Sequence, residues 1–549
     1  MNDPLLPTPM TGAGPRSLRE CGRWLWSGLF FPGTAPPSGR LSWCSVAVLA
    51  ALTAALLYPS LDFHLLEPDE GRYAEIPREM WARGEWIVPY LQGEPYLDKP
   101  PLLYWLVMLS YASFGISAAA ARLVPALAVQ ATVLASYLLG RRAIGERAAF
   151  WGSLLLAVMP GCVSIGRLLV LDGLLTLCTT VSLLAALLAV RTGRLQWGWW
   201  VVAAVSSGLG ILTKGPVVLA LVVPPVWLYR RLQCPGRGLG ARAWLALGLV
   251  AVAVSLPWYG AMVARLPTFV RHFFWEHHVV RYLEPFDHQQ PVWYYGPILL
   301  AGLLPGTMWL AALGRFLTSG DECQRQDRPP ELGFLLLAGG WCVLFFSLSG
   351  CKLPTYILPA FPPLALALGV VLGRRAADGR RGPAVAIAGM FALLLVAHHL
   401  VLPWYARLRS PWGRPERVVP YVLDRSRPVV CFPRHVDSLA FYLERDDLRN
   451  YRSKHVHLLV AELHQHPETV VLCTHRHSLE GLRHFLPSTL AIAQAEALPL
   501  QVPEWIERWL PALPRWLGET PFGLCHVAII RRQAGEGGGC TGADRAGLQ

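Results

Sequence analysis

The chain has 549 residues, of which 53% are hydrophobic and 15% charged, and its mean hydropathy is +0.37. A soluble domain carries roughly 25% charged residues, so this composition excludes an ordinary soluble enzyme and indicates a protein that crosses a membrane several times. The net charge of +13 does not indicate a nucleic-acid partner. The Lys and Arg residues stand in short clusters between apolar runs, as in the cytoplasmic loops of membrane proteins.

Residues 1–40 are polar and basic without a cleavage site after a short apolar stretch, and we expect them to form a cytoplasmic tail. The first predicted span is 41–58. Further apolar runs lie at 121–139, 148–163, 174–190, 197–212, 217–229, 243–260, 293–313, 332–348, 358–372 and 384–403.

Arg clusters, such as Arg141 with Arg142, occur in alternate connections between these runs. They all fall on the side of the N-terminal tail if residues 101–114 do not cross, and that run is shorter than the roughly 20 residues a span needs. This pattern predicts eleven crossings, or thirteen if two marginal segments also cross. The N-terminus is then inside and the C-terminus outside.

The remaining connections face outward, at 67–100, 167–172, 214–216, 265–291 and 352–356. They contain acids, histidines and aromatic residues as well as bases. Because the orientation follows from Arg clusters alone, the gathering of these chemically varied loops on one face predicts a site there.

The composition changes after residue 404. Short buried strands are predicted at 428–432, 469–474 and 526–531, and short helices at 438–444 and 479–485. We expect a small external α/β domain over 404–532 and a disordered Gly-rich tail at 533–549. The predicted fold class is a polytopic α-helical membrane protein with this domain at its C-terminus.

Two outward carboxylates are candidates for chemistry, because an acid close to lipid is costly unless it is solvated or paired. Asp69 lies in the first outward loop, where charges could also pair locally, Arg72 with Glu75 for example. Asp172 lies at the outer end of a span, where it could instead cap the following helix.

Four further residues have plain structural explanations when each is taken singly: an interfacial His, a snorkelling Arg, a basic anchor and an aromatic-belt residue. They are His278, Arg281, Lys352 and Tyr356. Together with the two acids they place carboxylates beside cations next to lipid. That combination suits the handling of a phosphorylated lipid.

Five motifs follow one another along the chain: Asp-Glu-Gly-Arg-Tyr-Ala-Glu at 69–75, Trp-Ile-Val-Pro at 86–89, Tyr-Leu-Asp-Lys-Pro at 96–100, Val-Trp-Tyr-Tyr at 292–295 and Lys-Leu-Pro-Thr-Tyr-Ile-Leu-Pro at 352–359. They resemble the motifs of the aminoarabinose transferases, polyprenyl-phosphate-dependent glycosyltransferases related to the protein O-mannosyltransferases. The resemblance implies a transmembrane glycosyltransferase domain over 41–403, with a catalytic external loop at 60–100. It implies the bacterial inner membrane, with the active site facing the periplasm.

The resemblance also implies the reaction. The donor is 4-amino-4-deoxy-L-arabinose on undecaprenyl phosphate, and the acceptor is a lipid A phosphate or a related envelope glycolipid. Asp69 resembles the loop carboxylate next to the reacting centre, and Asp172 the second acid. The residues that resemble those around the donor phosphate and sugar are Lys99, Arg281, Tyr73, Tyr96, Tyr356 and Lys352.

Asp98 and His278 stand where the family has an acid and a His near a bound divalent metal. The family usually has Glu at the first of these positions, and the Asp carboxylate reaches about one methylene less far. The resemblance implies a divalent metal held by Asp98 and His278, and the shorter reach of Asp98 counts against that metal.

The acceptor decides the role of Asp69. An acceptor phosphate with a second pKa near 6 is already largely ionised at neutral pH, so Asp69 would orient the sugar amine or the acceptor. With a Ser or Thr hydroxyl as acceptor, in a protein O-glycosyltransferase of the same architecture, Asp69 must act as a base. A lipid or sugar transporter is disfavoured, because the ionisable residues gather at one face and no internal repeat is evident.

Overall fold

The computed structural model describes residues 43–233, 238–280, 288–410, 412, 415–475, 477–498, 508 and 524–533, without the side chains of 277–279, 323 and 416. The predicted cytoplasmic tail at 1–40 and the tail after residue 533 lie outside the described residues. The chain forms two compact units. The helical unit comprises Met1–Asp62, Met80–Pro89 and Pro95–Leu402, and the α/β unit comprises Phe63–Glu79, Tyr90–Glu94 and Pro403–Gln549.

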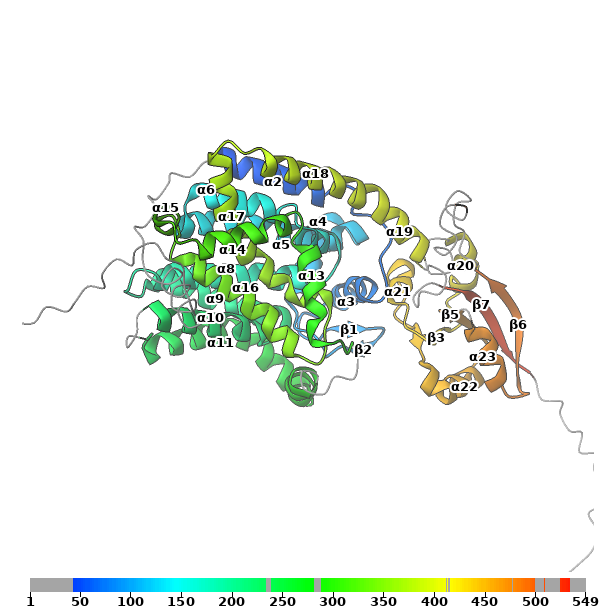
Figure 1. Cartoon of the computed structure of the whole chain (residues 1–549). Helices are drawn as coiled ribbons and strands as arrows, with labels where there is room; N and C mark the ends of the chain where they lie inside the picture. Colours follow the sequence, from blue (N-terminus) through cyan, green and yellow to red (C-terminus); the bar gives the residue numbers. More distant parts are fainter. Residues whose placement is uncertain are drawn as a thin grey trace, which may run out of the picture. The chain divides into compact units, whose positions relative to one another are not determined.

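The helical unit is built from helices of very different lengths (Figure 1). They are α2 (Trp43–Leu57), α4 (Leu102–Phe114), α5 (Ala118–Ile144), α6 (Glu146–Leu156), α7 (Pro160–Val163), η1 (Ser164–Arg167), α8 (Asp172–Val190), α9 (Trp197–Lys214), α10 (Val217–Gln233), α11 (Ala241–Arg265), η2 (Arg271–Val280), η3 (Val292–Tyr294), α13 (Tyr295–Gly302), η4 (Gly306–Trp309), α14 (Leu310–Thr318), α15 (Glu322–Gln326), α16 (Glu331–Leu348), η5 (Pro354–Ala360), α17 (Phe361–Ala377), α18 (Gly382–Val396) and η6 (Ala397–Val401). The helix α3 (Asp69–Arg83) begins in the α/β unit and ends in the helical unit, and α19 (Leu402–Arg409) follows η6.

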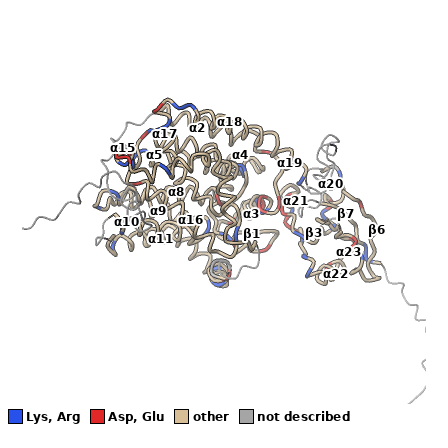
Figure 2. Tube along the Cα trace, viewed as in Figure 1, with Lys and Arg blue, Asp and Glu red and all other residues tan. Residues whose placement is uncertain are grey.

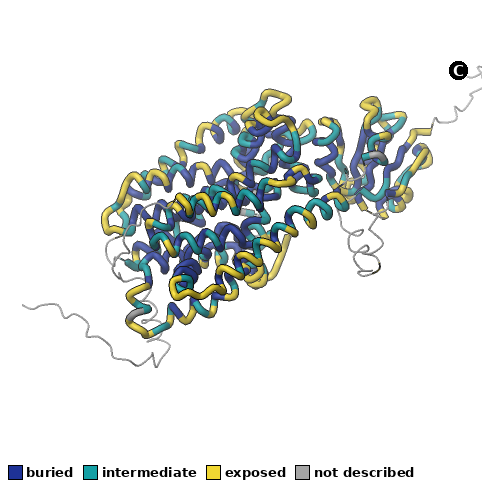
Figure 3. Tube along the Cα trace, turned by 90° about the horizontal axis from the view of Figure 1, so that it is seen from above, coloured by how far each residue is buried: buried dark blue, intermediate teal, exposed yellow. Residues whose placement is uncertain are grey.

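Six helical segments among the described residues are long and apolar enough to cross a membrane, and two bent pairs raise the number to eight. The six are Ala118–Ile144, Asp172–Val190, Ala241–Arg265, Glu331–Leu348, Pro354–Ala377 and Gly382–Arg409. The polytopic fold class is therefore confirmed, and the count of eleven crossings stays a prediction. Few charged residues lie along the helices of this unit (Figure 2). Exposed residues lie along its outer helices (Figure 3).

Two of the predicted spans are not straight helices. The run at 148–163 bends by 64° between Glu146–Leu156 and Pro160–Arg167, and the run at 293–313 bends by 96° between Val292–Gly302 and Gly306–Thr318. Hydropathy alone gave no sign of these bends. Pro160 and Pro305 lie at the two breaks, where a residue without a backbone N–H cannot continue the helix before it.

The basic connections meet at one end of α8. The guanidinium of Arg191 donates to the carbonyl of Arg142 and lies 3.5 Å from the carboxylate of Glu331, and Arg230 donates to the carbonyl of Gly193 at 2.9 Å. Asp172 begins α8 at its other end, about 28 Å away for 19 helical residues. The predicted basic side and the predicted site thus lie at opposite ends of one helix.

A buried arginine fixes the start of the first outward connection. The Arg167 guanidinium is fully buried and donates to the carbonyls of Leu56, Leu57, Pro59 and Ser60. The last carbonyls of a helix have no partner within it, and a cation near them is favourable. Arg167 therefore holds the chain where it leaves α2.

The α/β unit contains a five-stranded sheet in the order β4-β3-β5-β7-β6. Its strands are β3 (Val429–Phe432), β4 (Arg449–Asn450), β5 (Glu468–Cys473), β6 (Leu490–Ala497) and β7 (His526–Arg532), and its helices include α20 (Pro415–Val422), α21 (Asp437–Leu443), α22 (Val456–Gln465) and α23 (Ser478–Phe485). β3 runs parallel to β4 and β5, whereas β7 is antiparallel to β5 and β6. The predicted α/β domain is confirmed, but β4, β6 and α22 were not predicted.

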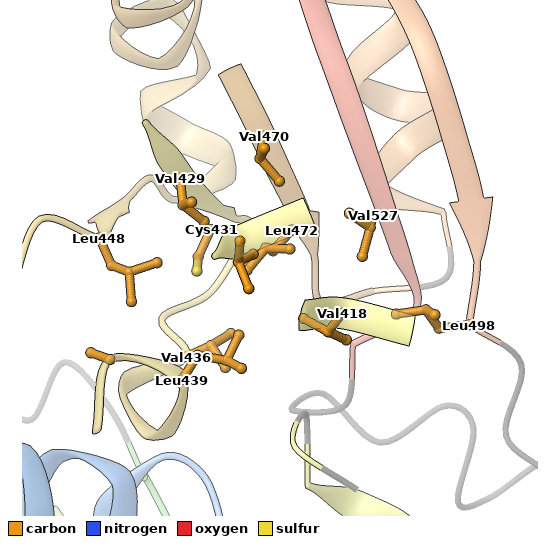
Figure 4. Packing of buried hydrophobic residues seen from close by; sticks show 12 residues of the cluster. Val418, Val429, Cys431, Val436, Leu439, Leu448, Val470, Leu472, Leu498 and Val527 are labelled. Atoms are coloured by element: carbon orange, nitrogen blue, oxygen red, sulfur yellow. The ribbon is translucent and has the colours of Figure 1, made fainter. Parts of the chain in front are cut away.

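Each face of the sheet carries its own hydrophobic cluster, because successive side chains of a strand point to opposite faces. Val429 and Cys431 pack on the face that also holds Leu439 of α21 (Figure 4). Val430 and Phe432 pack on the other face with helices α22 and α23, through Leu459 and Leu482 among others. Burial on both faces explains why β3 and β5 read as continuous apolar runs.

The loop at 60–100 is shared between the units. The sequence assigned all of it to the membrane part, but Phe63–Glu79 and Tyr90–Glu94 pack with the C-terminal segment. The reason is a polar and close-packed contact between α3 and α21, which local sequence patterns do not reveal.

Candidate active site

A cation and a carboxylate meet at the ends of two neighbouring helices. Lys214, the last residue of α9, places its ammonium nitrogen 2.6 Å from a carboxylate oxygen of Asp172, the first residue of α8. The side chains remain 19% and 10% exposed, respectively. Each charge is also favoured by its helix end, the acid at an N-terminus and the base at a C-terminus.

Tyr356 completes this cluster, because its ring centroid lies 4.5 Å from the Lys214 nitrogen. A cation over an aromatic face is attracted by the ring quadrupole. The Lys214 ammonium therefore lies between a carboxylate and an aromatic ring and remains partly exposed.

Asp172 is not the capping residue of α8, and its catalytic role stays a prediction. The residue that precedes α8 is Leu171, and no side chain makes a capping hydrogen bond there. The Asp172 carboxylate instead pairs with Lys214. Lys214 was not among the predicted site residues, although a lysine that ends an apolar run within an outward connection was a weak signal for one.

Lys352 bonds to backbone carbonyls, and its contact with the donor stays a prediction. Its buried ammonium donates to the carbonyl of Gln290 at 2.9 Å and to that of Ser349, and its backbone N–H donates to His288. The Tyr295 hydroxyl donates to the carbonyl of Leu353 at 3.0 Å. These bonds tie the motif at 292–295 to the motif at 352–359, so Lys352 organises the backbone beside Tyr356.

The motif at 86–89 is held by side chains from two helices. The indole N–H of Trp258 on α11 donates to Ile87 at 2.8 Å, and that of Trp105 on α4 donates to Trp86 at 2.7 Å. Arg265, at the end of α11, lies 2.6 Å from the Glu85 carboxylate. The backbone before the next motif is thereby fixed, and the N–H of Tyr96 donates back to Pro89 at 2.8 Å.

Asp98 lies beside a histidine that the sequence analysis did not select. A carboxylate oxygen of Asp98 is 3.1 Å from Nε2 of His272, whose Nδ1 is 3.1 Å from the Glu276 carboxylate. Lys99 donates to the carbonyl of Asp98 at 3.1 Å. The side chain of His278 and all of Arg281 lie outside the described residues.

The described side chains form no group of three or more His, Cys, Asp or Glu residues that could hold a metal ion. Asp98 has a histidine beside it, but both ring nitrogens of that histidine already face carboxylates. The described residues alone therefore do not make a complete metal site, and a metal held by Asp98 and His278 stays a prediction.

Asp69 and Tyr73 lie one helical turn apart at the start of α3, in the α/β unit. The acids and bases of this helix do not pair as the sequence suggested. Arg78 forms two hydrogen bonds with Glu75, at 2.6 and 2.7 Å, and Arg72 lies 3.5 Å from Asp437. Burial raises the pKa of Glu75 to about 8, although Arg78 acts against this rise.

Three comparisons place the chain among known proteins. Residues 41–273 match the family model described as dolichyl-phosphate-mannose-protein mannosyltransferase. The undecaprenyl phosphate-α-4-amino-4-deoxy-L-arabinose arabinosyl transferase 2 of Pseudomonas fluorescens is 31% identical over 546 residues, with 91% of this chain and 87% of that protein covered. The corresponding transferase of Edwardsiella ictaluri is 36% identical over 384 residues, with 68% of this chain and 66% of that protein covered.

The fold also has a solved counterpart. The crystal structure of ArnT from Cupriavidus metallidurans bound to undecaprenyl phosphate aligns with a TM-score of 0.68 at 22% identity, over 83% of this chain and 97% of that one. The apo structure of the same protein gives a TM-score of 0.67, over 82% and 96%. The chain therefore belongs to the family of undecaprenyl phosphate-α-4-amino-4-deoxy-L-arabinose arabinosyl transferases and is a membrane-embedded glycosyltransferase.

Proposed function

We propose that the protein transfers 4-amino-4-deoxy-L-arabinose from undecaprenyl phosphate to a phosphate group of lipid A, at the periplasmic face of the bacterial inner membrane. The relatives named above use this donor, according to their names. The observation that carries the proposal on this chain is the Asp172–Lys214 pair beside Tyr356. It offers a partly exposed cation at a helix end, where a lipid phosphate can reach it.

The reaction is a displacement at the anomeric carbon of the sugar. The bond from this carbon to the donor phosphate oxygen breaks, and undecaprenyl phosphate leaves with the electron pair. An oxygen of the acceptor phosphate forms the new bond to the same carbon. Because that phosphate is already largely ionised near neutral pH, no proton has to be removed from it.

Negative charge grows on the leaving phosphate as the bond breaks, and a preorganised cation stabilises it. Lys214 supplies such a cation, and Asp172 keeps it oriented. Lys99 and Arg281 act on the same phosphate in this proposal. Asp69 orients the sugar amine or the acceptor, and Tyr73, Tyr96 and Tyr356 contact the phosphate and sugar.

The test is transfer by the purified full-length protein in liposomes, with undecaprenyl-phosphate aminoarabinose as donor and lipid A as acceptor, read by mass spectrometry. We expect lipid A to gain the sugar on a phosphate, and lipid A from cells lacking the protein to lose this modification. Unmodified lipid A together with glycosylated Ser or Thr residues in envelope proteins would overturn the proposal. The match to the mannosyltransferase family model makes that outcome worth measuring in the same cells.

A further inference from the structure

We propose that Asp437, at the start of α21, is a positioning residue for Asp69: it holds α3 through Arg72 and so sets where the Asp69 carboxylate stands. The inference rests on the proposed function, in which Asp69 takes part in transfer. The C-terminal segment takes no direct part in the proposed reaction. Positioning Asp69 gives this segment an indirect part in catalysis.

The backbones of α3 and α21 approach each other closely. A Cβ atom added at Gly71 would lie 2.5 Å from the backbone nitrogen of Ser438 and 3.1 Å from the carbonyl carbon of Asp437. Real Cβ contacts are essentially never shorter than 3.0 Å, and the nearest atom in the way is backbone, with the Glu67 carboxylate oxygen next at 2.7 Å. Only glycine therefore fits at position 71, two residues after Asp69.

Polar contacts surround the first turn of α21. The Arg72 guanidinium lies 3.5 Å from one carboxylate oxygen of Asp437, and the Gln92 amide donates to the other at 2.9 Å. The backbone N–H of Ser438 donates to the Glu67 carboxylate at 2.6 Å. Residues before, within and after the first part of α3 thus contact the first turn of α21. Figure 2 shows charged residues on both helices.

Asp437 is fully buried, whereas the Arg72 side chain is 25% exposed. A buried carboxylate that loses its cationic partner is strongly destabilised, so the pair fixes the distance between the two helices. Two further bonds are made by one residue before α3 and one residue within it. The N–H of Leu65 donates to the Tyr442 hydroxyl at 2.9 Å, and Arg78 donates to the carbonyl of Arg445 at 3.4 Å.

Asp69 lies three residues before Arg72 in the same helix, so a shift or rotation of α3 moves both side chains together. Reaction rates are sensitive to such movements, because misplacing a reacting group by about 1 Å can cost roughly 100-fold. The contact with α21 therefore controls the position of Asp69 without touching substrate.

The same contact is sensitive to pH. Burial raises the pKa of Glu67 to about 8, with the charge of Asp437 as the second cause, and burial raises the pKa of Asp437 to about 6 against the charge of Arg72. The other titratable groups facing this pair or its Arg72 partner are Asp69, Glu75 and Glu79 of α3, the Cys431 thiol of β3, and His435. The ordinary pKa values of the two carboxyl groups are 4.5 and 3.8.

In the docked state, α3 and α21 make the contacts described above. Because the pKa values of Glu67 and Asp437 are raised in this state, it binds more protons than the undocked state between the ordinary and the raised pKa values. Docking is therefore strongest below pH 3.8 and weakens as the pH rises towards 8. Removing the charge of Asp437 lowers the pKa of Glu67, because that charge is one cause of the rise. The loss of docking with rising pH should then be smaller and should end at a lower pH.

The experiment measures kcat and KM of full-length Asp437→Asn, Asp437→Glu and Gly71→Ala proteins in liposomes from pH 5.5 to 8.5. We expect Asp437→Asn and Gly71→Ala to lower kcat by roughly 10- to 100-fold, with KM for the donor within about twofold of wild type. Asp437→Glu keeps the charge and should recover part of kcat. The alkaline decline of kcat, relative to its value at pH 5.5, should be smaller in Asp437→Asn alone.

Asp424→Asn is the matched control, an exposed acid of the same unit that bonds to Ser426, and it should leave kcat unchanged. Gly71→Ala removes no charge, so it tests the contact even if Asp437→Asn fails to fold. Wild-type kcat in both variants would overturn the positioning role. Absence of transfer by the wild-type protein would instead overturn the proposed function, and full activity of Asp69→Asn would remove its premise.

Discussion

The ammonium group of Lys214 and the carboxylate of Asp172 lie 2.6 Å apart, although the two residues belong to different helices. Asp172 is the first residue of α8 and Lys214 is the last residue of α9, so the ion pair joins the first turn of one helix to the last turn of the other. The Lys214 nitrogen also lies 4.5 Å from the centroid of the Tyr356 ring. The ammonium group is therefore oriented by both a carboxylate and an aromatic ring.

Asp172→Asn and Lys214→Met should each reduce transfer while the protein level in the membrane is kept. A hydrogen bond to a charged group contributes about 1.5–3 kcal/mol, which corresponds to a loss of roughly 10- to 150-fold in rate. Initial rates in liposomes measure this. Asp327→Asn is the control, because Asp327 pairs with Arg374 in a connection on the basic side. Near-normal rates in both variants would reduce the pair to a structural link.

Lys99→Ala and Arg281→Ala should each weaken transition-state binding by about the same amount, if both cations contact the leaving phosphate. Arg281→Lys should recover only part of the rate, because a single ammonium does not reproduce a two-pronged guanidinium contact with phosphate. Lys454→Ala, at an exposed lysine of the α/β unit, serves as the control. A snorkelling arginine would tolerate lysine fully, so wild-type rates for Arg281→Lys and Lys99→Ala would contradict the phosphate contact.

Glu67→Gln should stabilise the protein at pH 8 and leave it unchanged at pH 5. The amide keeps an acceptor for Ser438 N–H but never ionises, so it avoids the charge that the raised pKa of Glu67 makes unfavourable at high pH. The apparent melting temperature in detergent should rise by about 2–4 °C for each kcal/mol recovered. Glu480→Gln, at an exposed acid of α23, is the control. Equal shifts at both pH values would show that ionisation of Glu67 is not involved.

The orientation of the chain can be read from reporter fusions. Fusions at Arg231 and Arg375 should report the cytoplasm and a fusion at Gly537 the outside, because alternate Arg clusters mark the inner side. A cytoplasmic signal at Gly537 would invert the position of the α/β unit and the proposed periplasmic site with it.

The sequence predicted the membrane class well, because long apolar runs have few alternatives to helices that cross a bilayer. It predicted β3 and β5 for a related reason, since strands buried on both faces are short and continuously apolar. The strand β6 was missed because Leu490–Ala497 is rich in alanine, which has low strand propensity, and it forms only by pairing with β7.

The site was predicted in part. Asp172 was selected as an acid at the outer end of a span and Tyr356 as part of a motif, and the structure brings both close to one cation. Asp437 was missed because nothing in its neighbouring sequence marks it, whereas Lys214 carried only the weak signal of a lysine that ends an apolar run. Their importance arises from partners far along the chain, and single-sequence patterns do not encode such pairings.

The long stretch of sequence between α3 and α21 has a consequence for biogenesis. Glu67 and Ser438 are 371 residues apart, so a ribosome working at about 5–20 residues per second needs roughly 20–70 s to make the second after the first. During this interval α3 has left the ribosome with Gly71 and Arg72 facing no α21. The newly made enzyme should therefore remain inactive until its last segment has been made and folded, and a chain cut short after the final apolar run should insert into the membrane without becoming active.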